Sequence, residues 1–342
     1  MTTKRIYYYD VLNVVSCISV IALHCNGYVH RFDTADQCWW LHVLFEVAFY
    51  NAVPIFFMLS GATLLGYHKK YDTRTFFIKR LRKAFLPFLF WSVVFFLFAA
   101  VFTHTEFTPG SVAQKILTCR IPFTDYWFFV PLFLLYIFMP FLSVMVSHLK
   151  DSQVLCLVML IVGLQAIVKP VSLQVNVEWD LPMGSYVAYA LLGYYLSRTS
   201  WEQNRRVIIA VALMALLFMS LRYVLVLDSV YKKPVLWTYL SLYGYFGSAT
   251  IFLLVKRLCT NSGGGEPYPL PFGTFIRSVP SSAVLYHLHH HAYVQVDGKQ
   301  GLSSLRMDGS GDAGGSVLFV RCGGVGVAEV PLLPLGSSEL RT

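Results

Sequence analysis

The chain has 342 residues, of which 56% are hydrophobic and only 13% are charged, and its mean hydropathy is +0.58. A soluble domain carries about a quarter charged residues, so this composition excludes an ordinary soluble protein and predicts a polytopic membrane protein. The net charge of +9 could indicate a nucleic-acid partner, but its distribution argues otherwise, as described below. The seven cysteines show no metal-ligand spacing, and no metal site is predicted.

Eight stretches are apolar enough to cross a bilayer as helices, which takes about 20 residues each. They are 7–26, 40–66, 84–103, 127–147, 153–169, 183–197, 207–227 and 234–255. The sequence therefore predicts an all-α fold, a polytopic membrane helix bundle of about eight transmembrane helices. The second span is long, and Pro54 is expected to kink it.

Lysine and arginine are distributed unequally among the connecting segments. With the N-terminus in the cytoplasm, the inner segments hold fifteen of them and the outer segments six. This asymmetry is the one expected of cytoplasmic loops and predicts a cytoplasmic N-terminus. Because topology accounts for most of the positive charge, membrane lipid is an expected partner and nucleic acid is not.

Three polar residues mark the first span. Asn13 and His24 are eleven positions apart, close to three helical turns, and Asp10 precedes Asn13 by about one turn. All three share one face, with Asp10 near the cytoplasmic entry and His24 in the outer third, about 20 Å away. Ionisable groups inside membranes are functional by default, but an interfacial histidine wetted by lipid headgroups is the alternative for His24.

Glu46 of the second span lies at a depth close to that of His24. A carboxylate that accepts a hydrogen bond from one imidazole nitrogen raises the basicity of the other. The alternative is that Glu46 only bonds a neighbouring helix. In the same span, Ser60 and Gly61 near the cytoplasmic end favour close helix contact.

Seven cations lie between His68 and Lys83. A positive-inside anchor explains their number, but not the Arg-Leu-Arg pair formed by Arg80 and Arg82 at the start of the third span. Arginine forks suit phosphate oxygens, so a cytosolic phosphorylated ligand is expected there.

The character of the chain changes after Asn261. The segment NSGGGEPYPLPFG is a Gly/Pro-rich break, and no later stretch is long and apolar enough to span a bilayer. We predict a membrane domain over residues 1–260 and a Gly/Pro-rich non-membrane tail over 261–342. Two interpretations of the tail stay open. It is a flexible cytoplasmic tail, or it is the product of a shifted reading frame, since histidine codons moved by one base encode Ile or Thr.

Five segments in this order carry a resemblance: YYYDVLNVVSCISVIALHCN, VPIFFMLSG, FFIKRLRKAFLPFLFW, YWFFVPLFLLYIFMPFL and YVAYALLGYYLS. Over residues 5–260 the chain resembles the acyltransferase-3 family of integral membrane acyltransferases. It looks most like the O-acetyltransferases of bacterial surface glycans, including those of the enterobacterial common antigen type. The family has an arginine, ten residues and then a histidine in its first span. Here His24 matches the histidine, Asp10 matches the preceding aspartate, and Asn13 stands at the arginine position. The family also has ten spans, against the eight predicted here.

The resemblance implies an acetyl donor and a glycan acceptor. Acetyl-coenzyme A would act as acyl donor from the cytoplasm, with its phosphates near Arg80 and Arg82, and no bound cofactor is expected. His24 would serve as general base on a sugar hydroxyl or relay the acyl group, in a catalytic set with Asp10, Glu46 and Asn13. The acceptor would be a cell-surface or lipid-linked glycan, and the location a bacterial inner membrane, which the chain crosses several times.

Two other functions stay open. In a proton-coupled transporter or flippase, Asp10, Glu46 and His24 would relay protons, although the sequence shows no clear internal repeat of the kind frequent in transporters. An inactive, truncated acyltransferase is the second, because of Asn13 and the atypical C-terminus.

Overall fold

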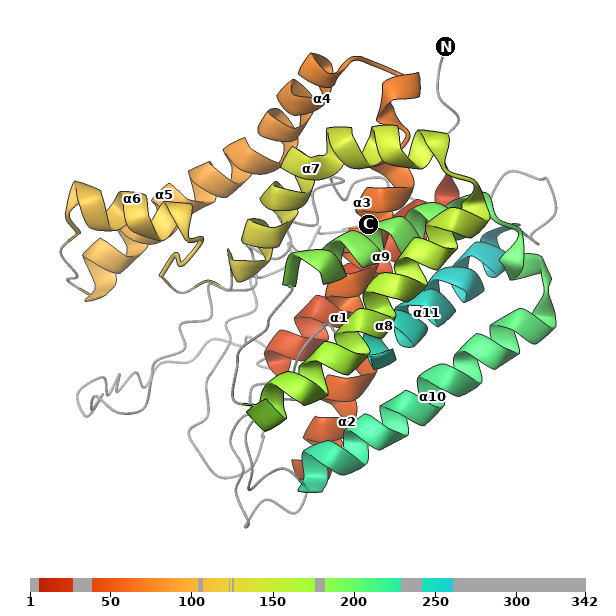
Figure 1. Ribbon diagram of the computed structural model, residues 1–342. Helices are drawn as coiled ribbons and strands as arrows, with labels where there is room; N and C mark the ends of the chain where they lie inside the picture. The colour runs from red at the N-terminus through yellow and green to blue at the C-terminus, as the bar shows by residue number, and fades with distance from the viewer. Residues whose placement is uncertain are drawn as a thin grey trace, which may run out of the picture. The chain divides into compact units, whose positions relative to one another are not determined.

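The computed structural model describes residues 6–26, 39–103, 107–122, 124, 126–175, 182–228 and 242–260 (Figure 1). Within these residues every regular element is a helix and there is no strand, so the predicted all-α fold is confirmed. The tail over 261–342 lies outside the described residues. Its interpretation and the domain boundary at residue 260 stay predictions.

The helices follow the predicted spans closely. They are α1 (Tyr7–Cys25), α2 (Trp39–Phe49), α3 (Ala52–Leu64), α4 (Thr73–Arg80), α5 (Leu86–Thr103), α6 (Pro109–Leu117), α7 (Phe129–His148), α8 (Asp151–Val175), α9 (Pro182–Arg198), α10 (Arg205–Asp228) and α11 (Leu242–Thr260). Within the described part of the chain, five helical stretches are long and apolar enough to cross a membrane: Tyr7–Cys25, Trp40–Lys69, Thr73–Val101, Tyr126–His148 and Asp151–Val168. The chain is a multi-pass membrane protein, and the exact number of spans stays a prediction.

The second span is interrupted, as Pro54 predicted. It divides into α2 and α3, with Asn51 as the first flanking residue of α3. Pro54 has no N–H to give to the Tyr50 carbonyl, and its ring crowds that carbonyl. Close to this break, the Val47 carbonyl in the last turn of α2 accepts from the Tyr243 hydroxyl of α11. The break thus becomes a polar junction between two elements far apart in sequence.

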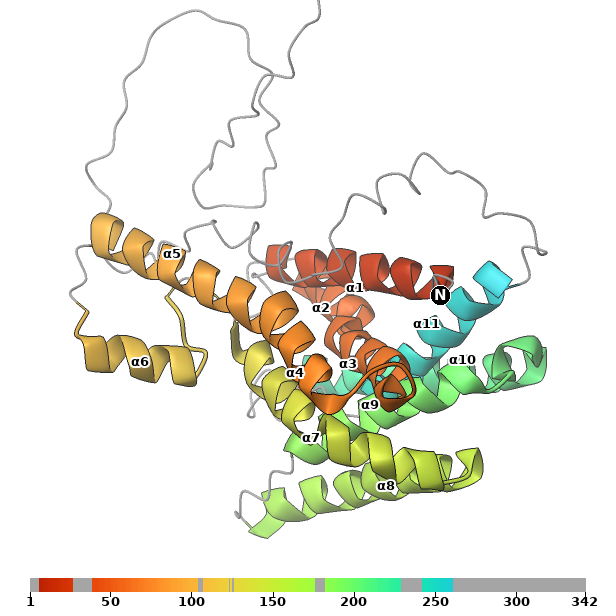
Figure 2. The same ribbon diagram turned by 90° about the horizontal axis from the view of Figure 1, so that it is seen from above.

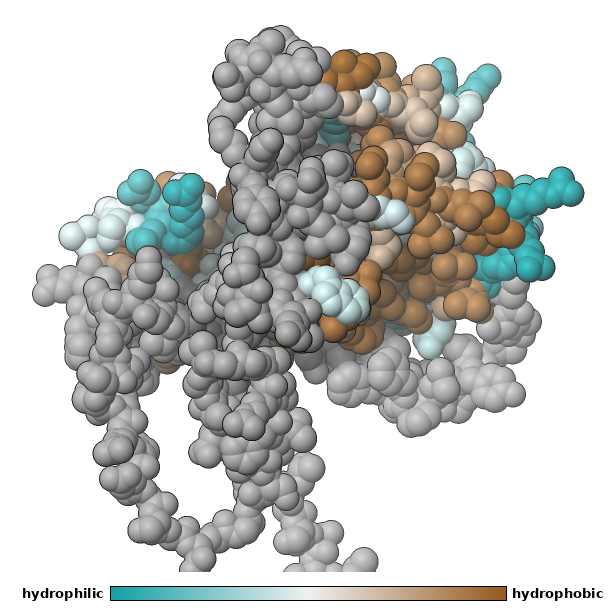
Figure 3. Space-filling view, turned by 90° about the horizontal axis from the view of Figure 1, so that it is seen from below, coloured by the Kyte–Doolittle hydropathy of each residue, from teal (hydrophilic) through white to brown (hydrophobic). Residues whose placement is uncertain are grey.

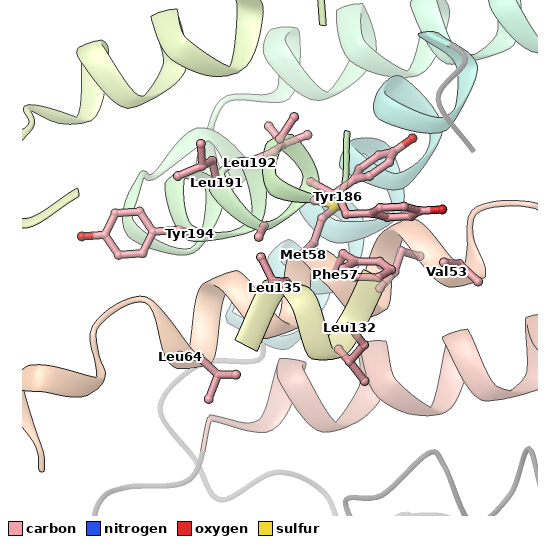
Figure 4. Close-up of a cluster of buried hydrophobic side chains, with 14 of the residues drawn as sticks. Val53, Phe57, Met58, Leu64, Leu132, Leu135, Tyr186, Leu191, Leu192 and Tyr194 are labelled. Atoms are coloured by element: carbon pink, nitrogen blue, oxygen red, sulfur yellow. The ribbon is translucent and has the colours of Figure 1, made fainter. Parts of the chain in front are cut away.

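The closest helix contact joins α3 to α9. A Cβ atom at Gly61 would overlap the Ala190 carbonyl, and one at Gly193 would overlap the Met58 carbonyl. The small residues of the second span therefore do allow close backbone approach, as expected at Gly61. Buried side chains of α3, α7 and α9 pack on this contact, with Phe57 lying 4.5 Å from Tyr186 between ring centroids (Figure 4). Elsewhere α10 and α11 lie side by side (Figure 1, Figure 2).

The third span begins earlier than predicted. Asp72 caps α4 by accepting from the Thr75 backbone N–H, so the helix starts at Thr73 rather than near residue 84. A π-helical turn over Leu81–Phe85 then joins α4 to α5. Five of the seven cations lie on this continuous helix (Arg74, Lys79, Arg80, Arg82 and Lys83), and only Lys69 and Lys70 precede it.

Large apolar side chains remain exposed on the outer helices. Phe90 and Leu97 of α5, Ile167 of α8 and Leu213 of α10 are each 61–65% exposed. Hydrophobic side chains also gather over much of the face drawn in Figure 3. A soluble monomer rarely exposes so much contiguous apolar surface, whereas lipid tails would cover it.

Candidate functional site

The polar stripe of the first span lies on one continuous helix, α1. The buried face of α1 is formed by residues such as Leu12, Ser16 and Val20. At 3.6 residues per turn, Asn13 and His24 lie about a quarter-turn around the helix from that face, and Asp10 lies about a third of a turn from it. Asp10 and Asn13 are half-buried and His24 is exposed. The stripe therefore lies beside the packed face of α1, and the catalytic roles of its three residues stay predictions.

At the end of α1, a pair of hydrogen bonds ties α1 to α2. The Asn26 amide nitrogen donates to the His42 backbone carbonyl at 2.7 Å, and His42 Nδ1 lies 2.8 Å from Asn26 Oδ1. Because the carbonyl can only accept, the Asn26 nitrogen faces it, and Asn26 Oδ1 must accept from the imidazole. His42 therefore carries its proton on Nδ1, which leaves Nε2 as the basic nitrogen.

Glu46 lies one helical turn after His42 on α2, so the two side chains share a face. Glu46 is buried, with 7% of its surface exposed. His42 and Asn26 are candidate site residues that the sequence reasoning missed. The signal was the His-x-x-x-Glu spacing within WWLHVLFEV. The pairing of Glu46 with His24 stays a prediction.

A second polar group gathers where α8, α9 and α11 meet. The Tyr245 hydroxyl donates to Gln165 Oε1 at 2.9 Å, and the Tyr245 ring stacks on Tyr189 with 4.2 Å between centroids. Gln165 Nε2 and the Ser185 hydroxyl are buried and have no hydrogen-bond partner among the residues that the structure describes. In the predicted topology this group lies in the outer half of the membrane. Apolar runs on either side hid it from the sequence reasoning.

The two arginines of the third span occupy different environments. Arg80 is half-buried, and its guanidinium carbon lies 5.9 Å from the Phe76 ring and 5.7 Å from the Tyr136 ring. Arg82 is exposed within the π-helical turn. Residues two positions apart point to different sides of a helix, so the structure does not bring the two guanidinium groups together.

The end of the bundle that holds Arg80, predicted to face the cytoplasm, is called the inner end here. The opposite end, with His24, Asn26 and His42, is the outer end. At the inner end the Ser143 hydroxyl of α7 donates to the Leu65 carbonyl at 2.6 Å, and His68 Nδ1 lies 2.5 Å from the same hydroxyl. Since that hydroxyl has one proton, His68 Nδ1 is the donor.

A buried ion pair also closes the inner end. Lys256 Nζ of α11 lies 3.0 Å from Glu202 Oε2, and both side chains are at most 7% exposed. The same ammonium donates to two backbone carbonyls at the end of α9. The Leu196 carbonyl lies within the last turn, and the Thr199 carbonyl lies just past it. Cations near a helix C-terminus stabilise its unpaired carbonyls. The sequence places Lys256 among the charges of a cytoplasmic loop. In the structure it is buried and joins α11 to Glu202 and to the end of α9.

No cluster of three or more histidine, cysteine, aspartate or glutamate side chains that could hold a metal occurs in the part of the chain that the structure describes. Three of the polar groups described above are candidates for binding a substrate or for catalysis. The first is the Asn26–His42–Glu46 set with the α1 stripe, the second is the Gln165–Tyr245 group, and the third is Arg80 with its neighbours.

Comparison with known proteins identifies the family. The sequence profile described as "Acyltransferase domain" (Acyl_transf_3) matches residues 6–273, which is more than three quarters of the chain. No curated protein and no solved structure matches the chain. The match includes both the α1 stripe and the arginines of the third span. The chain therefore belongs to the acyltransferase-3 family of membrane acyltransferases.

Proposed function

We propose that the protein moves an acetyl group from cytosolic acetyl-coenzyme A to a hydroxyl of a cell-surface or lipid-linked glycan at a bacterial inner membrane. The observation that carries this proposal is the family match over residues 6–273. The positions of the candidate residues support it, since Arg80 and Arg82 lie at the inner end and His24 lies at the outer end. The resemblance to the enterobacterial common antigen type of O-acetyltransferase supplies the choice of acceptor.

At the inner end, Arg80 and Arg82 are the proposed donor-binding residues. Their charge is permanent, and their forks suit the phosphate oxygens of the coenzyme. Because Arg82 is exposed and Arg80 half-buried, we assign Arg82 to phosphates at the surface and Arg80 to an oxygen that enters the bundle.

At the outer end, His24 is the proposed general base. The acceptor oxygen forms a bond to the acetyl carbonyl carbon, and the carbon–sulfur bond of the thioester breaks. The hydroxyl proton passes to His24 and then to the leaving thiolate. A base with a pKa near neutrality suits this step. Glu46 would stabilise the imidazolium that forms, whereas Asp10 lies about 20 Å away along α1 and would act at the inner end of the same path.

Asn13 stands where the family has arginine, so the α1 stripe lacks a fixed positive charge at that position. A carboxamide can donate and accept hydrogen bonds but carries no charge. We expect this difference to lower the rate rather than the affinity for the donor, because the donor arginines lie elsewhere.

The test is release of free thiol from acetyl-coenzyme A by the purified protein, supplied with membrane glycolipid extract as acceptor. We expect turnover by the wild type and a loss of at least 100-fold in His24→Ala, since general acid–base catalysis contributes roughly 10²–10⁴-fold. A wild type without turnover, restored by Asn13→Arg, would instead identify an acyltransferase inactivated at this position.

A proton-coupled transporter is the alternative in which the break between α2 and α3 would matter most. Discontinuous helices with buried polar groups are frequent at transporter binding sites. Asn51 Oδ1 at this break is buried and has no hydrogen-bond partner in the described part of the chain. Glycan transport that proceeds without acetyl-coenzyme A and survives in His24→Ala would favour this function.

A further inference from the structure

The polar group where α8, α9 and α11 meet contains two atoms that the rest of the described structure does not use. Gln165 Nε2 and the Ser185 hydroxyl are both buried and make no hydrogen bond with the residues that the structure describes. The Ser185 side chain is completely buried, with 0% of its surface exposed. A buried polar atom without a partner lowers stability, and native structures contain few of them. Two of them in one place favour a partner that another molecule supplies.

The position of Ser185 in α9 explains why its hydroxyl is unused. Five other serines are buried in the described helices, and the hydroxyl of each donates to a backbone carbonyl. Four of the five bond the carbonyl four residues earlier in their own helix: Ser16, Ser19, Ser92 and Ser248. Ser185 lies in the first turn of α9, which begins at Pro182, so no carbonyl of its helix lies four residues before it. Its hydroxyl is therefore available to a ligand.

The Gln165 amide keeps one of its atoms for a ligand in either orientation. The Tyr245 hydroxyl donates to Gln165 Oε1 at 2.9 Å, which leaves both Nε2 protons unused. If the amide is turned over, Nε2 donates to the Tyr245 oxygen, and Tyr245 donates to the Ser185 carbonyl, 3.4 Å away. Oε1 is then the unused atom. A ligand carbonyl suits only the first orientation because it only accepts, whereas a hydroxyl accepts and donates and so suits both.

Gly184 leaves room beside this amide. A Cβ atom at Gly184 would lie 3.6 Å from Gln165 Nε2 and 3.8 Å from Ile161 Cγ2, both ordinary contact distances. No other side chain of the described structure, those of its chain neighbours aside, comes within 4 Å of that position. This space, called the Gly184 gap here, is large enough for a methyl group or an oxygen atom. It lies beside the Gln165 amide, and Ser185 is the next residue of the chain.

The Gly184 gap lies toward the outer end of the bundle. At the inner end, Arg198 in the last turn of α9 pairs with Asp151 at the start of α8, at 3.1 Å. Gln165 follows Asp151 by fourteen residues, and Ser185 precedes Arg198 by thirteen. At about 1.5 Å per residue, both lie roughly 20 Å outward of this ion pair, within a bilayer core of about 30 Å. In the predicted topology, a surface glycan would approach from this side.

The helices that form the Gly184 gap carry no charge around it. No Lys, Arg, Asp or Glu occurs at 152–168 of α8, at 182–197 of α9 or at 242–255 of α11. On α8 the next charged position outward is Lys169, at the end of the predicted span. Burying an anion among uncharged groups is costly, so the gap suits a neutral oxygen better than a phosphate. A sugar hydroxyl is neutral and both donates and accepts.

We propose that Gln165 and Ser185 form a subsite for one hydroxyl of the glycan acceptor, on a sugar unit other than the one that is acetylated. The hydroxyl occupies the Gly184 gap, where its oxygen accepts from Gln165 Nε2 and its proton goes to Ser185 Oγ. The subsite binds and does not react, since the proposed base His24 belongs to α1, which contributes none of the residues named in this group. This inference rests on the proposed function, in which the acceptor is a cell-surface or lipid-linked glycan.

The experiment measures how much radiolabelled membrane glycolipid the full-length protein retains in lipid nanodiscs, without acetyl-coenzyme A. At subsaturating glycolipid, Ser185→Ala should retain about threefold to tenfold less than the wild type, because one hydrogen bond to the ligand is lost. Gly184→Ala should lower retention by at least this factor, since its methyl group fills the gap at ordinary contact distances. Equilibrium binding of acetyl-coenzyme A should be the same in all three proteins, because the proposed donor arginines lie at the inner end.

Matched measurements separate a ligand site from general damage. Gly163→Ala is the control for the glycine, since Gly163 lies two residues from Gln165 on α8 and a Cβ there meets nothing within 4 Å. It should retain glycolipid as the wild type does. Ser185→Ala removes a buried hydroxyl that has no partner in the described structure, so its Tm without glycolipid should be unchanged or higher. A purely structural role, such as a bond to a buried water, predicts the opposite pair of results: a lower Tm and unchanged retention.

The inference is overturned if Ser185→Ala and Gly184→Ala retain glycolipid as the wild type does. Thiol release from acetyl-coenzyme A by the same preparation of wild type keeps the two proposals distinguishable. Turnover by a wild type whose variants retain glycolipid unchanged, or which retains none itself, would remove the subsite and leave the proposed function. A wild type that neither retains glycolipid nor releases thiol would refute both.

Discussion

At the inner end of the bundle the Arg80 guanidinium lies near the rings of Phe76 and Tyr136, and α3 packs on α9 where glycines let the two backbones touch. At the outer end Asn26 and His42 join the end of α1 to the start of α2 through two hydrogen bonds. The inner arrangement is braced by several helices at once, whereas the outer one depends on two local bonds. In the proposed function, the geometry of the donor site would therefore depend on the packing of several helices, and the geometry of the acceptor site would depend on single side chains.

The largest effect is expected from removing what braces the inner end. In Gly61→Val the new side chain would overlap the Ala190 carbonyl, and neither backbone can move without separating α3 from α9. We expect no folded protein, measured as monodisperse yield in detergent. Gly66→Ala is the control, because a Cβ there meets no atom within 4 Å. A stable, folded Gly61→Val protein would show that the close contact between α3 and α9 is not needed for folding.

The next effect concerns the buried ion pair at the inner end. Lys256→Met leaves Glu202 buried and unpaired, which costs about 3–5 kcal/mol of unfolding free energy. Asp151→Asn breaks the ion pair between Asp151 and Arg198, in which both side chains are 45% exposed. This change should cost at most about 1 kcal/mol of unfolding free energy. Chemical denaturation in detergent compares the two. Equal losses would show that burial does not distinguish these pairs.

A third prediction separates the two ends by kinetics. Asn26→Ala removes the acceptor that holds the His42 proton on Nδ1, so we expect kcat to fall about fivefold to tenfold. KM for acetyl-coenzyme A should not change, because Asn26 lies at the outer end. Thiol release in membrane vesicles measures both constants. A raised KM with unchanged kcat in this variant would remove the distinction between the ends.

The smallest effect is expected at the cap of α4. Thr75 donates to Asp72 through its hydroxyl, at 2.5 Å, and through its backbone N–H, which holds the pKa of Asp72 below its ordinary value. The carboxylate therefore stabilises α4 above the usual aspartate pKa, and this contribution is lost as the pH falls through the lowered pKa. Asp72→Ala should raise KM for the donor less than twofold. It should also remove this acid-dependent part of thermal stability, measured as Tm against pH.

Much of the fold could be predicted because apolar runs of membrane length determine where helices lie. The break before Pro54 and the close approach at Gly61 followed from the properties of those two residues. The start of α4 was missed because the cations after His68 masked a helical segment, although Asp72 followed by Thr73 is a capping signal. His42 had a local signal in its spacing from Glu46.

Other site features had no local signal. Tyr136 and Tyr245 lie in apolar runs, where a single hydroxyl changes neither hydropathy nor periodicity. The burial of Lys256 on α11 depends on its ion pair with Glu202, which lies in the connection between α9 and α10. Such pairings are set by how helices pack, and a single sequence does not state which helices are neighbours.

The central claim is that one chain binds an acetyl donor at its inner end and completes transfer at its outer end. Its most direct test adds radiolabelled acetyl-coenzyme A to the cytoplasmic face of inverted inner-membrane vesicles and measures label in the extracted glycolipids. We predict labelled glycolipid with the wild type, none with His24→Ala, and equal donor binding by both. Labelling by His24→Ala at the wild-type rate, or loss of its donor binding, would contradict the separation of the two sites.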